Sequence, residues 1–261
     1  MFRWIVWFCW GCLLAICAHA AEPQTYSVCA DPDPPPWTYW KRDAEGRKGR
    51  EFIGSSVDTL RAAFAAIGKT VEFHGEYPWA RCLAMVEGGQ IDFAMDAYYD
   101  TARARRFAYS SHYNTLTPQL FFRANKPLKV ANVMDLKNYV GCGMIGASYV
   151  HYGLAAEDLD LGSGYDGLIK KLKAQRCDYF VEELEVIAGY QFIGTDYLAD
   201  PEIRHGPVPG AKAPAKHLIA AKNSPGASLL PRLDAALAGL VKSGEAARIW
   251  KQHAGNLPYT P

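Results

Sequence analysis

Short apolar runs alternate with amphipathic stretches along the first half of the chain. Apolar residues fall on one helical face from Val57 to Ile67, where Ser55 or Ser56 can cap the helix and Gly68 can end it. A second helix is expected to open at Pro78, whose fixed backbone suits a first helical turn. The predicted strands beside these helices are residues 26–30, 70–73 and 91–95. This strand–helix order predicts a parallel sheet with helices on its faces.

A second series of the same kind follows an extended segment at residues 116–123. Residues 199–215 are rich in proline and glycine and are expected to form a return crossing. The predicted strands of this half are residues 140–145, 177–181 and 217–221, and the predicted helices are residues 133–137, 164–174, 228–241 and 245–253. The chain therefore contains two successive α/β units.

The two halves share a local pattern. Residues 90–96 and 175–183 both run through a polar turn, an aspartate, an aromatic residue and apolar residues to an acidic end. The acidic ends are Asp96 in the first half and Glu182 with Glu183 in the second. Ligands of α/β sheets bind outside the carboxyl ends of the strands, so these acids are expected to face each other across a crevice.

Polar and aromatic residues follow the strand at residues 91–95. Arg103 has a planar guanidinium that can hold a carboxylate through two hydrogen bonds, whereas Arg105 and Arg106 are expected on a solvated surface. Tyr98 and Tyr99 are adjacent, so one is expected to point to the core and the other to the crevice. The sequence thus predicts half of a small-molecule site here.

The N-terminal residues have the features of a secretory signal peptide. Arg3 precedes a long apolar run, and small residues around position 20 form a cleavage site, so residues 1–20 are excluded from the fold. A lipoprotein signal is a weaker alternative, because Ile16 precedes Cys17 where a small residue is usual. Removing Arg3 takes the net charge from +1 to zero, which gives no indication of a nucleic acid partner.

Four cysteines remain after the signal peptide is removed: Cys29, Cys82, Cys142 and Cys177. An exported compartment permits disulfides, and four cysteines allow three pairings. Free buried thiols are the alternative. The spacings match no zinc pattern, and the sequence contains no phosphate loop, dinucleotide fingerprint or nucleophile elbow, so no metal, cofactor or catalytic residue is expected.

An ordered set of short motifs resembles the periplasmic solute-binding proteins of polar amino acid transporters, known as family 3. The residues that carry the resemblance are Asp31, Pro36, Trp37, residues 54–58, residues 89–92, Thr101, Arg103, Tyr109, Ser110, Tyr113, residues 146–148 and residues 176–178. They extend through most of the mature chain in the order of the family. The resemblance implies an α/β, periplasmic binding protein-like fold with two lobes joined by hinge strands and a ligand cleft between them.

The resemblance also implies how the chain is divided. Lobe 1 is expected to be discontinuous, at residues 21–121 and 215–261, and lobe 2 to comprise residues 122–214. In such an arrangement, disulfides Cys29–Cys82 and Cys142–Cys177 would each stay within one lobe.

Roles for individual residues follow from the same resemblance. Arg103 corresponds to the arginine that holds an α-carboxylate, and Glu183, with Glu182 as the alternative, to the acid that accepts an α-ammonium. The remaining expected ligand-binding residues are Asp31, Trp37, Trp79, Asp96, Tyr98, Ala147 and Ser148, with Trp37 and Trp79 as apolar walls and Gly146, Ala147 and Ser148 as donors to the carboxylate.

Three features depart from the family pattern, and one is Pro34, which occupies a position where an aromatic residue often stacks on the ligand. Thr101 and Arg103 are one residue closer together than usual, which shortens the turn that positions Arg103. Asp96 stands where small hydroxyl residues are frequent and adds a carboxylate to the cleft. This extra acid favours a ligand with more than one positive nitrogen, unless Asp96 pairs with an arginine of its own lobe.

The function expected from the resemblance is that of a monomeric periplasmic receptor, which captures an amino acid or similar amine-carboxylate for an inner-membrane ABC permease. Two alternatives stay open. Some relatives on this scaffold are exported dehydratases of prephenate-like acids, for which Glu183 or Asp96 would act as acid or base. A sensory or accessory protein that binds a ligand and signals to a partner is the other.

Overall fold

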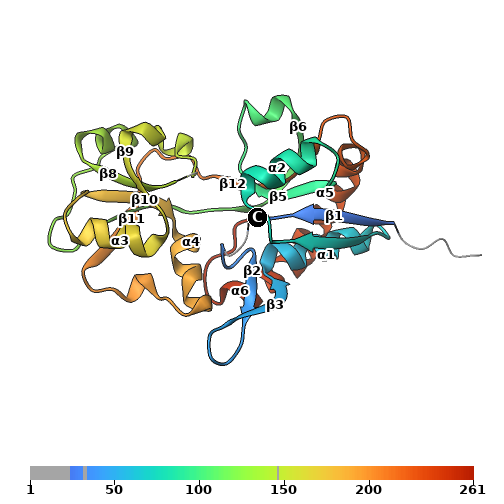
Figure 1. The fold of residues 1–261 in the computed structure, drawn as a ribbon, viewed down its shortest axis with the longest axis horizontal. Helices are drawn as coiled ribbons and strands as arrows, with labels where there is room; N and C mark the ends of the chain where they lie inside the picture. Colours follow the sequence, from blue (N-terminus) through green and yellow to red (C-terminus); the bar gives the residue numbers. More distant parts are fainter. Residues whose placement is uncertain (1–23, 32–33, 146) are drawn as a thin grey trace, which may run out of the picture.

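The computed structural model describes residues 24–31, 34–145 and 147–261. The expected signal peptide at residues 1–20 and the expected donor Gly146 lie outside the described residues. The described chain forms two α/β lobes, each built on a five-stranded sheet, on the right and left of Figure 1. This architecture confirms the two-lobed α/β fold expected from the sequence.

The first lobe has the sheet order β4-β1-β5-β12-β6. Its strands are β1 (Thr25–Cys29), β4 (Thr70–His74), β5 (Phe93–Ala97), β6 (Phe107–Thr115) and β12 (Ala215–Ala221). β4, β1 and β5 are parallel as expected, whereas β12 is antiparallel to both β5 and β6. β12 thus brings residues from near the end of the chain beside β5.

Helices cover both faces of this sheet. They are α1 (Ser55–Ala66), α2 (Trp79–Glu87) and α5 (Pro225–Ser243), and α6 (Glu245–Ala254) packs against α1 and α5. Val28 and Phe93 pack in one apolar cluster with residues of α1 and α5, while their chain neighbours Cys29 and Ala94 pack in another with α2. Alternate residues of a strand point to opposite faces, so each strand contributes to both clusters.

The second lobe has the sheet order β11-β7-β10-β8-β9. Its strands are β7 (Pro118–Arg123), β8 (Gly141–Met144), β9 (Leu159–Gly162), β10 (Tyr179–Glu183) and β11 (Ile203–Pro207). β10 lies in the middle, parallel to β8 and antiparallel to β7. Residues 118–121 therefore pair within this sheet, although the sequence assigned them to lobe 1.

The remaining elements are short. The second lobe has helices α3 (Tyr165–Lys173) and α4 (Leu184–Gly189) and the 3-10 turns η2 (Val133–Asn138), η3 (Val150–Tyr152), η4 (Ala156–Asp158), η5 (Tyr190–Ile193) and η6 (Tyr197–Ala199). The first lobe adds η1 (Arg103–Arg105) and the hairpin of β2 (Tyr39–Arg42) and β3 (Lys48–Ile53), which projects at the bottom of Figure 1. Within the described residues, no helix combines the length and apolar character needed to cross a membrane.

Two segments connect the lobes, at residues 116–117 and 208–214. The backbone N–H of Leu116 donates a 2.9 Å hydrogen bond to the carbonyl of Pro214, so the two connections lie side by side. Thr117 accepts from the backbone of Leu184 at 2.8 Å and donates to Glu185, which ties α4 to the crossing. Helix α4 comes so close to the loop before Trp37 that Gly189 has no room for a side chain against the Pro35 carbonyl.

Each lobe contains one disulfide. Cys29 is bonded to Cys82 and Cys142 to Cys177, with Cα atoms 5.9 and 5.7 Å apart. The structure therefore selects one of the three pairings that the sequence allowed.

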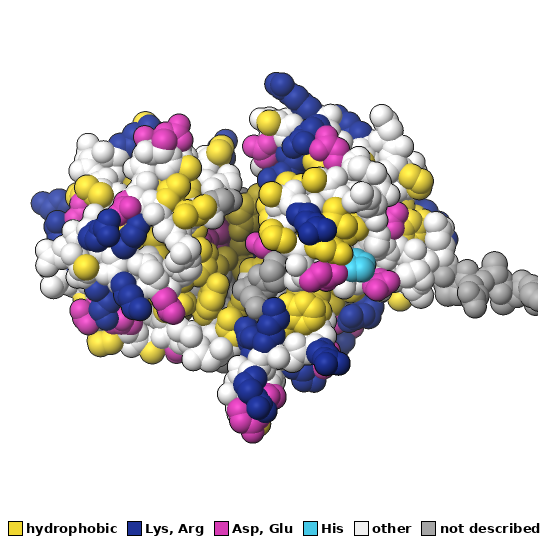
Figure 2. Space-filling view, in the orientation of Figure 1, with side chains coloured by type: hydrophobic (Ala, Val, Ile, Leu, Met, Phe, Trp, Pro, Cys, Tyr) yellow, Lys and Arg dark blue, Asp and Glu magenta, His cyan; other side chains and the backbone are white. Residues whose placement is uncertain are grey.

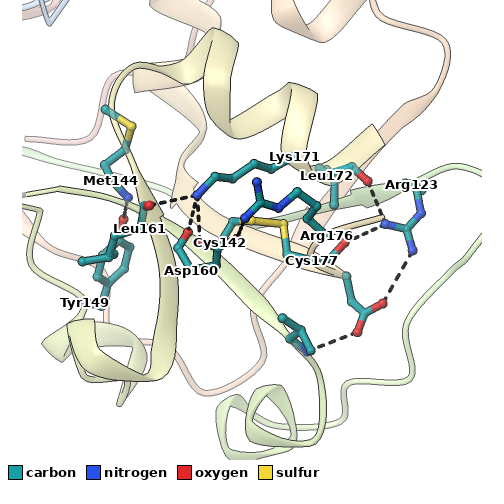
Figure 3. The surroundings of a disulfide bond; sticks show 12 residues. Arg123, Cys142, Met144, Tyr149, Asp160, Leu161, Lys171, Leu172, Arg176 and Cys177 are labelled. Atoms are coloured by element: carbon teal, nitrogen blue, oxygen red, sulfur yellow. Dashed lines mark hydrogen bonds and ion pairs between the residues drawn. A yellow bond between two sulfur atoms is a disulfide. The ribbon is translucent and has the colours of Figure 1, made fainter. Parts of the chain in front are cut away.

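The second-lobe disulfide lies in a polar network, shown in Figure 3. Arg123 is buried and donates to the carbonyls of Leu172 (2.8 Å) and Cys177 (2.6 Å), while Lys171 binds Asp160 at 2.8 Å. These bonds join the end of α3 to the sheet, and the strand that carries Glu182 and Glu183 begins just after this network.

Candidate functional site

The candidate site is a cleft of about 240 Å³ between the two lobes. Figure 2 shows the hollow between them on this face of the molecule. Nine of the ten expected ligand-binding residues line the cleft: Asp31, Trp79, Asp96, Tyr98, Arg103, Ala147, Ser148, Glu182 and Glu183. Trp37 does not; it is fully buried, and its indole N–H donates to Asn114 at 2.6 Å.

Two central strands place acids from both lobes in this cleft. β5 carries Asp96 next to its last residue, and β10 ends in Glu182 and Glu183. Both strands occupy the middle of their sheets, which agrees with the repeated pattern in the sequence. The acids face the same space, as expected.

Glu183 is the centre of a hydrogen-bond network. Its carboxylate receives hydrogen bonds from Tyr98 (2.9 Å), His151 (2.7 Å) and Tyr152 (3.1 Å). Burial by itself would raise the pKa of Glu183, but the hydrogen bonds, led by that from His151, lower it to about 2. Glu183 is therefore a stable carboxylate at neutral pH.

The pKa of Glu182 is shifted in the opposite direction. Burial, followed by the negative charge of Glu183, raises the pKa of Glu182 well above its ordinary value. Its partners are the hydroxyl of Tyr165 at 2.6 Å and the backbone N–H of Glu183 at 3.0 Å. Of the two candidate ammonium acceptors, Glu183 is the one whose pKa is lowered, and it is therefore the better carboxylate for an ammonium.

Asp96 is held in an unusual backbone conformation. Its φ angle is +61°, a left-handed value that few residues other than glycine adopt. Oδ1 accepts hydrogen bonds from Ser56 and Tyr113, both at 2.7 Å. Oδ2 is buried without a hydrogen bond, 3.9 Å from the ammonium of Lys216 on β12. The cation beside Asp96 is thus a lysine of its own lobe and not the arginine considered from the sequence.

Arg103 lies on the first-lobe wall of the cleft. Its guanidinium donates to the carbonyl of Tyr98 at 2.9 Å and lies over the half-buried Trp79, 5.7 Å from the ring centre. Its backbone N–H is capped by Asp100 at 2.7 Å, which orients the short turn η1. Arg105 and Arg106 are exposed, as expected, and Arg106 pairs with Glu87.

The tyrosine pair differs from the expectation. Tyr98 reaches across to Glu183, whereas Tyr99 is 62% exposed and packs against Tyr109. Both tyrosines line the cleft, and Tyr98 also packs against the buried cluster that contains Trp37, because the chain leaves the sheet at Ala97 and strand alternation no longer applies.

Several cleft residues were missed by the sequence analysis: His151, Tyr152, Tyr165 and Lys216. They come from η3, α3 and β12, none of which carries a recognisable motif. The signal that could have found Lys216 is its position at the start of an apolar strand, where a single lysine must either pair or face a cavity.

The cleft therefore combines fixed negative charge with a smaller number of cations. Arg103 can bind a carboxylate, Glu183 can accept an ammonium, and Trp79 and the tyrosines supply apolar walls. Among the described residues, no group of three histidine, cysteine or acidic side chains is arranged to hold a metal ion.

Fold and cleft together define a two-lobed protein of the periplasmic binding protein type. Residues 26–256 match the bacterial extracellular solute-binding proteins, family 3, so the chain belongs to this family. No curated protein sequence matches the chain.

Similar solved structures have the same fold. The arginine-, lysine-, histidine-binding protein ArtJ from Geobacillus stearothermophilus is 20% identical, with a TM-score of 0.68 over 90% of this chain and 97% of its own. The amino acid transporter protein AbpA from Streptococcus pneumoniae, bound to L-arginine, is 19% identical, with a TM-score of 0.68 over 88% and 94%. A histidine kinase sensor domain is 24% identical, also with a TM-score of 0.68, over 90% and 97%.

Proposed function

We propose that the protein captures an amino acid, or a similar small amine-carboxylate, in the cleft between its lobes. The observation that carries this proposal is the placement of Arg103 and Glu183 on opposite walls of one cleft. A bidentate cation on one side and a low-pKa carboxylate on the other match the two charges of an α-amino acid.

The chain is further proposed to work in the periplasm, as a monomer that delivers its ligand to an inner-membrane ABC permease. Support comes from membership of an extracellular solute-binding family and from the signal-like residues 1–20. The amino acid transporter proteins among the similar structures support the same role. Cells that lack the protein should then take up the identified ligand more slowly.

A thermal-shift screen of the purified protein against amino acids tests the binding step. Saturation with a true ligand should raise the melting temperature by roughly 5 °C, since binding stabilises the folded state by mass action. If no amino acid or related amine-carboxylate shifts the melting temperature, the proposed function is wrong.

Arg103→Ala tests the proposed carboxylate contact. The variant should bind the ligand about 100-fold more weakly, because it loses a charged, paired hydrogen bond. Arg105→Ala is the matched control, since Arg105 is exposed two residues away on the same turn, and its affinity should equal that of the wild type. Equal losses in both variants, or none in either, would contradict the assignment of Arg103.

A further inference from the structure

Lys216 occupies surroundings that would otherwise suit a positively charged ligand group. It extends from β12 into the cleft and is only 5% exposed. Its ammonium lies 4.1 Å from the ring centre of Trp37 and 5.6 Å from that of Tyr98. Two acids, Asp96 and Asp31, interact with the same charge. Aromatic faces and carboxylates are the groups that bind organic cations in proteins, and here the chain supplies the cation itself.

The contact between Lys216 and Asp96 is incomplete. At 3.9 Å, the two atoms are too far apart for a hydrogen bond. Asp96 Oδ2 is nevertheless buried and has no hydrogen-bond partner among the described residues. A buried carboxylate oxygen without a donor is unfavourable, and a group that donates to Asp96 and accepts from Lys216 would satisfy both.

We propose that Lys216 determines specificity: the cleft selects amino acids with an uncharged polar side chain and rejects those with a second ammonium or guanidinium. A carboxamide or hydroxyl both donates and accepts, so it satisfies Asp96 and Lys216 together. A second cation on the ligand would be repelled by the ammonium of Lys216, which is buried and cannot move into solvent. This inference rests on the proposed function, because it names the ligand class of the same site.

Lys216→Met tests the proposal by removing the charge while keeping most of the side-chain volume. Affinities are measured by calorimetry for glutamine, asparagine and serine and for lysine, arginine and ornithine. The tightest wild-type ligand should be one of the first three. In the variant, Asp31 and Asp96 lose their cation, so the affinity ratio should shift towards the cationic amino acids by at least about tenfold.

Matched variants distinguish the effect of removing the charge from a nonspecific effect of the substitution. Lys222→Met makes the same change at an exposed lysine just beyond the same strand and should leave the ratio unchanged. Asp96→Asn combined with Lys216→Met removes both charges and should abolish the gain. If Lys216→Met does not fold, Lys216→Gln, which keeps a polar side chain, replaces it with the same expectation.

The inference is overturned if the tightest wild-type ligand is cationic, acidic or apolar, or if neither Lys216 variant changes the ratio while binding persists. Those results would leave the proposed capture of amino acids intact. Absence of binding by every amino acid, in the wild type and in all variants, would instead overturn both the function and the specificity.

Discussion

The hydroxyl of Tyr98 donates a 2.9 Å hydrogen bond to Oε2 of Glu183 and joins the two lobes across the cleft. Tyr98 follows β5 in the first lobe, and Glu183 ends β10 in the second. Burial, and then the charge of Glu183, raises the pKa of Tyr98 well above its ordinary value, so the hydroxyl keeps its proton. The first-lobe wall of the cleft is thus hydrogen-bonded to an acid of the second lobe.

Tyr98→Phe removes this bond and little else. We expect roughly tenfold weaker ligand binding, because a hydrogen bond to a charged acceptor contributes about 1.5–3 kcal/mol and this one favours apposition of the lobes. Small-angle scattering of the ligand-free variant should show a larger radius of gyration. Tyr77→Phe, at a tyrosine of the same lobe that lies outside the cleft, should match the wild type in both measurements. Unchanged affinity in Tyr98→Phe would show that the bond has no part in binding.

Glu183 should make the stability of the folded protein depend on pH in the acidic range. Its pKa of about 2 in the folded protein lies below the ordinary value of 4.5, so its stabilising effect is complete above about pH 4.5 and disappears as the pH falls towards 2. Glu183→Gln should lower the melting temperature at neutral pH and flatten its fall between pH 4.5 and 2. The control is Glu157→Gln, at an exposed acid of the same lobe. Superimposable curves for Glu183→Gln and the wild type would contradict this role.

Arg123 should be a main determinant of second-lobe stability. Arg123→Ala leaves the carbonyls of Leu172 and Cys177 without their donor in a buried site, so we expect a loss of about 3–5 kcal/mol in the free energy of unfolding. Urea denaturation measures this loss. Arg176→Ala removes an arginine that is 63% exposed and pairs with Asp160 at 3.5 Å, and it should cost less than about 1 kcal/mol. Comparable losses in both variants would show that the buried network is not responsible.

The local elements were largely predictable from the sequence. Helix α1 and strands β1 and β4 agree with their predicted ranges to within a few residues, because apolar periodicity and glycine ends are local signals. β6 was missed, since its buried and exposed positions do not alternate. β11 was also missed, because it lies in a segment rich in proline and glycine.

The sequence by itself determined the fold class and the acids of the cleft. Asp96, Glu182 and Glu183 follow apolar strands, and strand ends in α/β sheets meet at the ligand. Only the tertiary structure decided which groups meet them: Lys216 reaches Asp96 through the antiparallel pairing of β12 with β5, across 120 residues of sequence. Such contacts depend on strand register and lobe apposition, which no local pattern records. The same long-range geometry decided the disulfide pairs and shifted the pKa values of Glu182 and Glu183 in opposite directions.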